Sequence, residues 1–250
     1  MSGTTITTTT ITFIDIFRNW FIRKSIFNAI ESIDVTTTSL SWVKGRLIRN
    51  NTKQMLKCGV DWSFIKHHKH QFKLDIINKH ILLLDQLLIY YCSHPQANLS
   101  TLINILLYIY PFDYQPNGSI FNQASESGHI NIAKYLHYRY PNIKGVTYDA
   151  MDCASKNGHY FIVRFLHYNR SEGCSKMAID WSSRSGYVSI VSFLTDHRTE
   201  GSTKLAMDYA AESGMLHILK YLHYNRTEGC SKMAIDQAAF NEQRDVLLML

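Results

Sequence analysis

Apolar and polar positions follow a helical period in the second half of the chain. Around residue 210, apolar residues stand three and four positions apart in two short runs, 205–211 and 216–222. This spacing places the apolar side chains of each run on one face of a helix. Gly214, between the runs, is typical of the residue that ends a helix in a left-handed conformation. The pattern therefore predicts a pair of short antiparallel helices joined by a tight turn.

The helix-pair pattern repeats along the chain. Four segments with this pattern begin 28 residues apart, at Gly145, Gly173, Gly201 and Gly229. One more copy precedes them, with Gly128 lying 30 residues before Gly158, and residues 92–107 fit loosely, with Asn98 where the glycine belongs. Because one helix pair cannot cover its apolar face alone, neighbouring pairs must stack. We expect five antiparallel helix pairs over residues 119–250, in one right-handed stack.

The repeated segments resemble ankyrin repeats. Residues 206–222, AMDYAAESGMLHILKYL, are similar to the family pattern TPLHxAAxxGHxxIVxxLL, and Gly128-His129 and Gly158-His159 match its Gly-His pair. Two features depart from the family: Leu205–Asp208 replaces the TPLH tetrapeptide, and the period is 28 residues instead of about 33. Short repeats of this kind form large multigene families in some protists and large DNA viruses. The resemblance covers residues 89–250 and implies an all-α ankyrin-like solenoid for protein recognition, without catalytic residues.

Three polar positions recur in successive repeats and are predicted to join the repeats. The recurring residues are Asp152, Asp180, Asp208 and Asp236, then Arg170, Arg198 and Arg226, and finally Glu172, Glu200 and Glu228. A catalytic carboxylate pair is expected once in a chain, not once per repeat. The resemblance adds that the aspartates replace a histidine that ties neighbouring ankyrin loops. Each aspartate is expected to accept hydrogen bonds from loop N–H groups or from the arginine of an adjacent loop. Periodic metal binding is the alternative, although no Gly-rich acidic loop accompanies it.

Two positions on the first helix of each pair vary between repeats and are candidates for recognition. The resemblance implies that the first of them points to the concave face. The varying residues are Cys153, Trp181, Tyr209 and Gln237 at one position, and Lys156, Arg184, Glu212 and Phe240 three residues later. The candidates for protein binding are Trp181, Arg184, Tyr209, Glu212, Cys153 and Lys156. Trp, Tyr and Arg are the usual anchors of an interface, so Trp181, Arg184 and Tyr209 are the strongest of these. Packing of Trp181 and Tyr209 against a neighbouring loop is the alternative.

The first 88 residues lack a clear repeat. Residues 1–12 are rich in threonine and are predicted to form a disordered tail. Residues 13–30 have apolar positions three and four apart, which predicts an amphipathic helix or a broken pair of helices. Residues 13–88 are therefore expected to form a helical N-terminal region that caps the stack or contains decayed repeats. The alternatives are an F-box-like head, which would make the chain a substrate adaptor, and a presequence or membrane-surface helix.

Histidines recur in two contexts. The segment Lys66–His70 resembles a metal or polyanion patch, but no cysteine flanks it at ligand spacing, and we expect a solvated loop. His137, His167 and His223 each follow the last leucine of a second helix, where they are expected to interact with unpaired carbonyl groups. We therefore predict neither a metal nor another cofactor.

Composition and charge narrow the remaining classes. The 250 residues are 46% hydrophobic, which is enough for a sizeable core. The apolar runs end before the roughly 18 to 20 residues of a membrane span. Five scattered cysteines indicate a reducing compartment, so we expect the cytoplasm, with the nucleus as an alternative. Residues 119–250 have 14 Lys and Arg against 13 Asp and Glu, which argues against nucleic-acid binding.

These observations favour a protein without enzymatic activity. The chain has no phosphate-binding loop, nucleophile elbow or HExxH zinc pair. We predict an ankyrin-repeat protein-binding scaffold or adaptor for an unidentified protein, and a truncated family copy without a dedicated partner is the alternative. Residues 246–250 are all apolar, although a terminal repeat normally has a polar outer face. The C-terminal helix pair is thus expected to be frayed or buried against another chain, for example through self-association.

Overall fold

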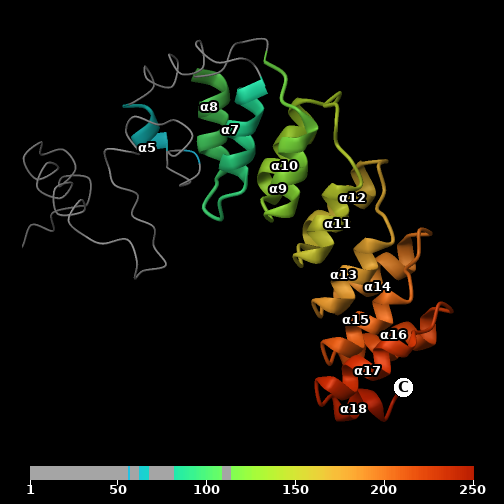
Figure 1. Cartoon of the computed structure of the whole chain (residues 1–250). Helices are drawn as coiled ribbons and strands as arrows, with labels where there is room; N and C mark the ends of the chain where they lie inside the picture. The colour runs from blue at the N-terminus through green and yellow to red at the C-terminus, as the bar shows by residue number, and fades with distance from the viewer. Residues whose placement is uncertain (1–55, 57–61, 68–81, 109–113) are drawn as a thin grey trace, which may run out of the picture. The chain divides into compact units, whose positions relative to one another are not determined.

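The computed structural model describes residues 56, 62–67, 82–108 and 114–250, all of which belong to one compact unit, Leu56–Leu250. Regular structure in these residues is helical, and no strand occurs among them (Figure 1). The all-α class predicted from the periodicity is confirmed for this part of the chain. The predictions for residues 1–30 and for His68–His70 lie outside the described residues, whereas Lys66 and His67 are exposed in a turn.

Helices make up most of the described part of the chain. The helices that precede residue 114 are α5 (Trp62–Ile65), α7 (Leu82–Cys92) and α8 (Leu99–Tyr108). Between residues 114 and 250 five pairs follow: α9 (Gly118–Glu126) with α10 (Ile130–Arg139), α11 (Asp149–Lys156) with α12 (Tyr160–Asn169), α13 (Met177–Arg184) with α14 (Val188–His197), α15 (Leu205–Glu212) with α16 (Leu216–Asn225), and α17 (Lys232–Phe240) with α18 (Arg244–Leu247).

Contacts between the helices follow chain order. The two helices of each of the five pairs contact one another, and each pair also contacts the next (Figure 1). The first helices α9, α11, α13, α15 and α17 form one row of contacts, and the second helices α10, α12, α14, α16 and α18 form another. Helices α7 and α8 contact α9 and α10 in the same way. Contacts between neighbouring helices therefore run in chain order from α7 onward.

Small side chains on the first helices allow this close packing. The buried small residues of these helices are Ala124, Ser125, Ala150, Ala154, Ser155, Ala178, Ser182, Ser183, Ala206, Ala210, Ala211, Ala234 and Ala238. Larger apolar side chains of the second helices, such as Ile162, Ile190 and Ile218, are buried as well. Pairing small residues with large ones lets helix backbones approach while the core stays filled.

The turn within each pair depends on a residue with positive φ. Glycine occupies it in four pairs, for example Gly214 with φ 69°, but Glu242 occupies it between α17 and α18 with φ 57°. The prediction that Asn98 replaces the glycine before α8 is wrong. Asn98 lies directly before the helix, and its side-chain oxygen accepts a hydrogen bond from the Thr101 N–H at 2.9 Å. Asparagine there caps the helix instead of supplying the turn.

The C-terminal pair is the shortest of the five. Helix α18 contains four residues, whereas the other second helices contain ten each between residues 114 and 250. Leu248, which follows α18, is 79% exposed. In the described residues, no helix combines the length and the apolar character needed to cross a bilayer.

Candidate functional site

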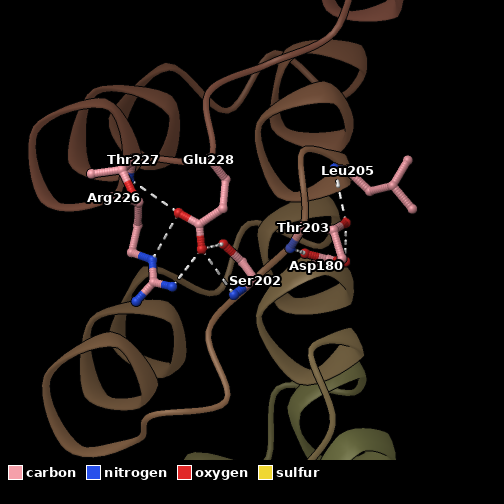
Figure 2. A network of polar contacts seen from close by, with 7 residues as sticks. All are labelled: Asp180, Ser202, Thr203, Leu205, Arg226, Thr227 and Glu228. Atoms are coloured by element: carbon pink, nitrogen blue, oxygen red, sulfur yellow. Dashed lines mark hydrogen bonds and ion pairs between the residues drawn. The ribbon is translucent and has the colours of Figure 1, made fainter.

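The recurring aspartates join each helix pair to the next. Asp180 of α13 accepts two hydrogen bonds from Thr203, which lies just before α15: one from the N–H at 2.9 Å and one from the hydroxyl at 2.7 Å (Figure 2). The same hydroxyl oxygen accepts a hydrogen bond from the Leu205 N–H at 3.1 Å (Figure 2). Thr203 thus caps the N-terminus of α15 and also binds the Asp180 carboxylate of the preceding helix pair.

The same contact occurs at the neighbouring repeats. Asp152 accepts hydrogen bonds from the N–H and hydroxyl of Ser175, and Asp208 accepts both from Ser231 at 2.8 and 2.7 Å. The Asp152, Asp180 and Asp208 side chains are buried. Burial raises the pKa of the Asp152 and Asp180 carboxyl groups, and the hydrogen bonds from Ser175 and Thr203 oppose that rise.

Two members of the series differ from the rest. Asp236 is exposed and has no hydrogen bond within the described residues. In the first of the five pairs, Asn122 replaces the aspartate, and its amide donates to the Thr147 hydroxyl at 3.1 Å. Sequence reasoning missed Asn122 and the hydroxyl partners. A usable signal was present, because a serine or threonine stands two residues after each of the four repeat glycines.

The recurring arginines pair within their own loops. Arg226 and Glu228 form an ion pair with 2.5 Å between Nη2 and Oε1, and Arg170–Glu172 and Arg198–Glu200 pair in the same way. Of the two donors expected for the aspartates, the loop N–H groups are the ones found, while these arginines pair with glutamates instead. Each arginine stands two positions before its glutamate, which brings the two side chains together locally. Hydroxyl groups already satisfy the aspartates.

The glutamates extend this contact to the preceding loop. Glu228 Oε1 accepts from the N–H and the hydroxyl of Ser202, both at 3.4 Å (Figure 2). Glu200 accepts from the Cys174 N–H at 3.4 Å. Hydrogen bonding from Arg226 lowers the pKa of Glu228 to about 2 although burial opposes this. For Glu200, burial raises the pKa, but hydrogen bonds led by that from Arg198 outweigh it, and the net shift is downward.

The candidate recognition residues lie in a diagonal series across first helices. We call Cys153, Lys156, Trp181, Arg184, Tyr209 and Glu212 the first-helix stripe. Lys156 Nζ lies 5.2 Å from the ring centroid of Trp181, and Arg184 Cζ lies 5.0 Å from that of Tyr209. Arg184 Nη2 also lies 2.8 Å from Glu212 Oε1. The end of each helix thus contacts the middle or end of the next.

The stripe remains accessible to solvent. Lys156 and Arg184 are exposed, while Trp181, Tyr209 and Glu212 are half-buried. The Trp181 and Tyr209 rings each lie beside a cation of the preceding first helix. Phe240, at the corresponding position of α17, is 84% exposed, and Gln237 is half-buried.

The chemistry of the stripe suits binding. Burial raises the pKa of the Cys153 thiol, with Glu126 contributing, so the thiol stays protonated near neutral pH. A protonated thiol is a weak nucleophile. In the described segments, no group of three or more His, Cys, Asp and Glu side chains is arranged to hold a metal ion. Aromatic rings beside cations present a mixed apolar and charged surface, which is typical of interface anchors.

The histidines at the ends of second helices contact aromatic rings. The His137 and Phe165 ring centroids lie 5.5 Å apart, and those of His167 and Phe193 lie 5.3 Å apart. The Nδ1 atoms of His137 and His167 are buried without a hydrogen-bond partner in the described structure. Burial lowers the pKa of both rings, which favours the neutral form. These two Nδ1 atoms therefore do not make the predicted contact with a helix-end carbonyl group.

Comparison with known proteins adds no assignment. No family model matches the chain, and no match is found among curated proteins. The family resemblance therefore depends on the repeated residues themselves.

Proposed function

We propose that this chain is a non-enzymatic protein-binding scaffold of the ankyrin-repeat type, and that the first-helix stripe is its recognition surface. One observation carries the proposal: residues that join the repeats recur, while solvent-accessible residues in register with them differ. The Asp180–Thr203 contact recurs as Asp208–Ser231, for example. At the stripe, Trp181 is followed by Tyr209. A recognition scaffold requires recurring contacts between repeats together with a surface that varies from repeat to repeat.

Two rows of helix contacts support an ankyrin-like solenoid. First helices contact first helices and second helices contact second helices along α9 to α18. Each first helix is eight or nine residues long in these five pairs. The polar contacts lie in the connection between one pair and the next, where ankyrin repeats of about 33 residues have a longer loop that builds a β-hairpin finger. We propose that Asp-hydroxyl and Arg-Glu contacts join the repeats in place of that finger.

The side chains of the stripe support protein recognition. Trp, Tyr and Arg carry much of the energy of protein interfaces because they bury a large area and make directed contacts. Here Arg184 is held between the Tyr209 ring and the Glu212 carboxylate. A side chain held in this way loses less freedom when a partner binds. We place the scaffold in the cytoplasm, where free thiols such as Cys92 and Cys174 stay reduced.

The test uses proximity labelling with the full chain in cells that express it. A Trp181→Ala, Arg184→Ala, Tyr209→Ala variant is compared with the native chain and with Tyr224→Ala, which removes a tyrosine that is 81% exposed on α16. We expect a defined set of labelled proteins that the triple variant loses and Tyr224→Ala keeps. Circular dichroism melting must show that both variants are folded. An unchanged labelled set in the folded triple variant contradicts the proposal.

A further inference from the structure

The second helices present a different surface. Helices α10 and α12 contact each other, and both expose aromatic and basic side chains. Their exposed aromatic residues are Tyr138 (68%), Phe161 (74%) and Tyr168 (60%). Their exposed basic residues are Lys134, Arg139 and Arg164. We call these six residues the outer patch; it lies on second helices, whereas the stripe lies on first helices.

Ring contacts hold the outer patch together. The Tyr138 ring centroid lies 6.4 Å from that of Phe165, and Lys134 Nζ lies 6.0 Å from the Phe165 centroid. Arg164 Cζ lies 6.0 Å from the Tyr168 centroid. Because Phe165 is itself buried, it links exposed side chains of α10 to the core of α12. Tyr138, Lys134 and Arg164 thus each contact an aromatic ring of α12.

The charge of the outer patch has one sign. Helices α10 and α12 contain no Asp or Glu. Among the described residues, Lys134, Arg139 and Arg164 belong to none of the ion pairs, unlike the loop arginines. A cation above a ring keeps N–H groups available for an oxygen ligand at its edge. The patch thus offers three available cations between exposed rings.

The basic and aromatic pattern stops at α14. Ser192 and Asp196 stand 28 residues after Arg164 and Tyr168. Asp196 accepts a hydrogen bond from the Tyr221 hydroxyl at 3.0 Å. Lys220 and Tyr224 restore the spacing on α16, but the acidic α14 separates them from the patch. The surface is thus limited to two helices, and α16 supplies a matched control.

We propose that the outer patch binds an acidic segment of a partner protein. Carboxylates of the segment pair with Lys134, Arg139 and Arg164, and an aromatic side chain of the segment packs on the exposed rings. Charge complementarity selects this occupant, because an unpaired basic surface gains most from an anionic ligand. A protein segment is favoured over nucleic acid because residues 119–250 carry almost balanced charge, and phosphate binding requires many cations.

The test measures binding of a defined probe to the full chain. The probe is a fluorescein-labelled peptide of alternating Glu and Tyr, followed by fluorescence anisotropy. We expect saturable binding that weakens as salt rises. The Lys134→Glu, Arg164→Glu variant should raise the Kd at least roughly tenfold because two attractive contacts become repulsive. Lys220→Glu, which makes one such charge reversal on α16, should alter the Kd by less than about twofold, and Lys134→Glu alone is the single substitution to which it is compared.

Three further results would overturn the proposal. One is the absence of saturable binding, and another is an equal effect of Lys220→Glu, since attraction would then come from net charge alone. The third is tighter binding of a labelled oligothymidylate of equal charge, which would assign the patch to nucleic acid. Trp181→Ala separates this proposal from the function of the stripe: peptide binding should persist in it. Loss of binding in Trp181→Ala would place the peptide on the stripe and contradict the outer patch.

Discussion

Asp180 and Asp236 stand at the same position of their repeats but have different surroundings. Asp180 is fully buried and accepts two hydrogen bonds from Thr203, while Asp236 is exposed. A buried carboxylate is tolerated only where donors replace its hydration. The following helix pair supplies these donors to Asp180. The environment, and not the residue type, therefore decides what each aspartate contributes.

Replacing Asp180 tests this difference. Asp180→Ala should lower the free energy of unfolding by about 1 to 3 kcal/mol, because the N–H and hydroxyl of Thr203 lose their acceptor. Asp236→Ala should change it by less than about 0.5 kcal/mol, as for other exposed substitutions. Urea denaturation followed by circular dichroism measures both. Similar losses for the two variants would show that Asp180 contributes no more than an exposed aspartate.

Glu242 carries backbone strain that a single substitution should relieve. It has φ 57°, where the other four pairs of the array have glycine. A side chain in that conformation costs of order 1 kcal/mol or more. Glu242→Gly also raises the conformational entropy of the unfolded chain, which offsets part of the stability gained in the folded state. We expect a net stabilisation of up to about 1 kcal/mol.

Thermal denaturation of Glu242→Gly is compared with that of Ser213→Gly. Ser213 precedes the corresponding glycine of the previous pair and has φ −91°, so no strain is relieved there. Its substitution should lower the melting temperature, because glycine increases the conformational entropy of the unfolded chain and relieves no strain in the folded one. A lower melting temperature for Glu242→Gly as well would show that the glutamate is not strained.

At the scale of elements, Arg-Glu pairs contact the loop that precedes their own. Gly201 has φ 77°, and a Cβ atom added there would lie 2.6 Å from Arg226 Nη2 of the next loop. Gly229, with φ 66°, would meet nothing within 4 Å. Both glycines adopt positive φ, but only Gly201 is covered by a following loop. The Arg226–Glu228 pair thus orders its own loop and covers the previous one.

The Glu228 carboxylate should make stability depend on pH. Its folded pKa is about 2 instead of 4.5, so its contribution is present above pH 4.5 and is lost as pH falls toward 2. The difference in unfolding free energy between the native chain and Glu228→Gln should therefore narrow over that window. Urea denaturation at several pH values measures it. In an Arg226→Ala background, the pH dependence of this difference should largely disappear, and its persistence would exclude the pair as the cause.

Much of the helical arrangement was predictable, because it depends on local signals. Periodic apolar residues and the turn glycines indicate the pairs, and repetition reveals which polar residues are structural. The partners of those residues were harder to predict. Arg198 and Asp180 both recur at the repeat period. Only the three-dimensional structure shows that Arg198 forms an ion pair with Glu200, while Asp180 accepts a hydrogen bond from Thr203. A recurring residue shows that a position matters, but not which contact it makes.

The candidate surfaces illustrate the same limit. Trp181 and Tyr209 were predictable because they vary within a constant frame. Their cation partners belong to the first helix of the preceding pair, about one repeat away in sequence. The outer patch was missed, because its pattern of cation and tyrosine four residues apart is interrupted at Ser192 and Asp196. Its significance depends on the contact between α10 and α12, which sequence spacing does not show.

For the whole molecule, chain-order contacts imply that stability is distributed unevenly. Helices α13 and α14 contact pairs on both sides, whereas α17 and α18 contact only α15 and α16 among the pairs described. Ile179 of α13 is 1% exposed, while Ile235 at the same position of α17 is 48% exposed. In an array of this kind, stability is the sum of each unit and its neighbouring interfaces.

Hydrogen exchange should reveal this gradient in the 250-residue chain. Backbone amides of α17 and α18 should exchange through local opening at a lower free energy than those of α13 and α14, because one interface is lost instead of two. Native-state exchange measured by mass spectrometry resolves these segments. Increasing protection of α17 and α18 with protein concentration would indicate the self-association predicted for the C-terminal residues. Equal protection of all helices from α11 to α18 at low concentration would contradict the gradient, because the array would then open only as a single unit.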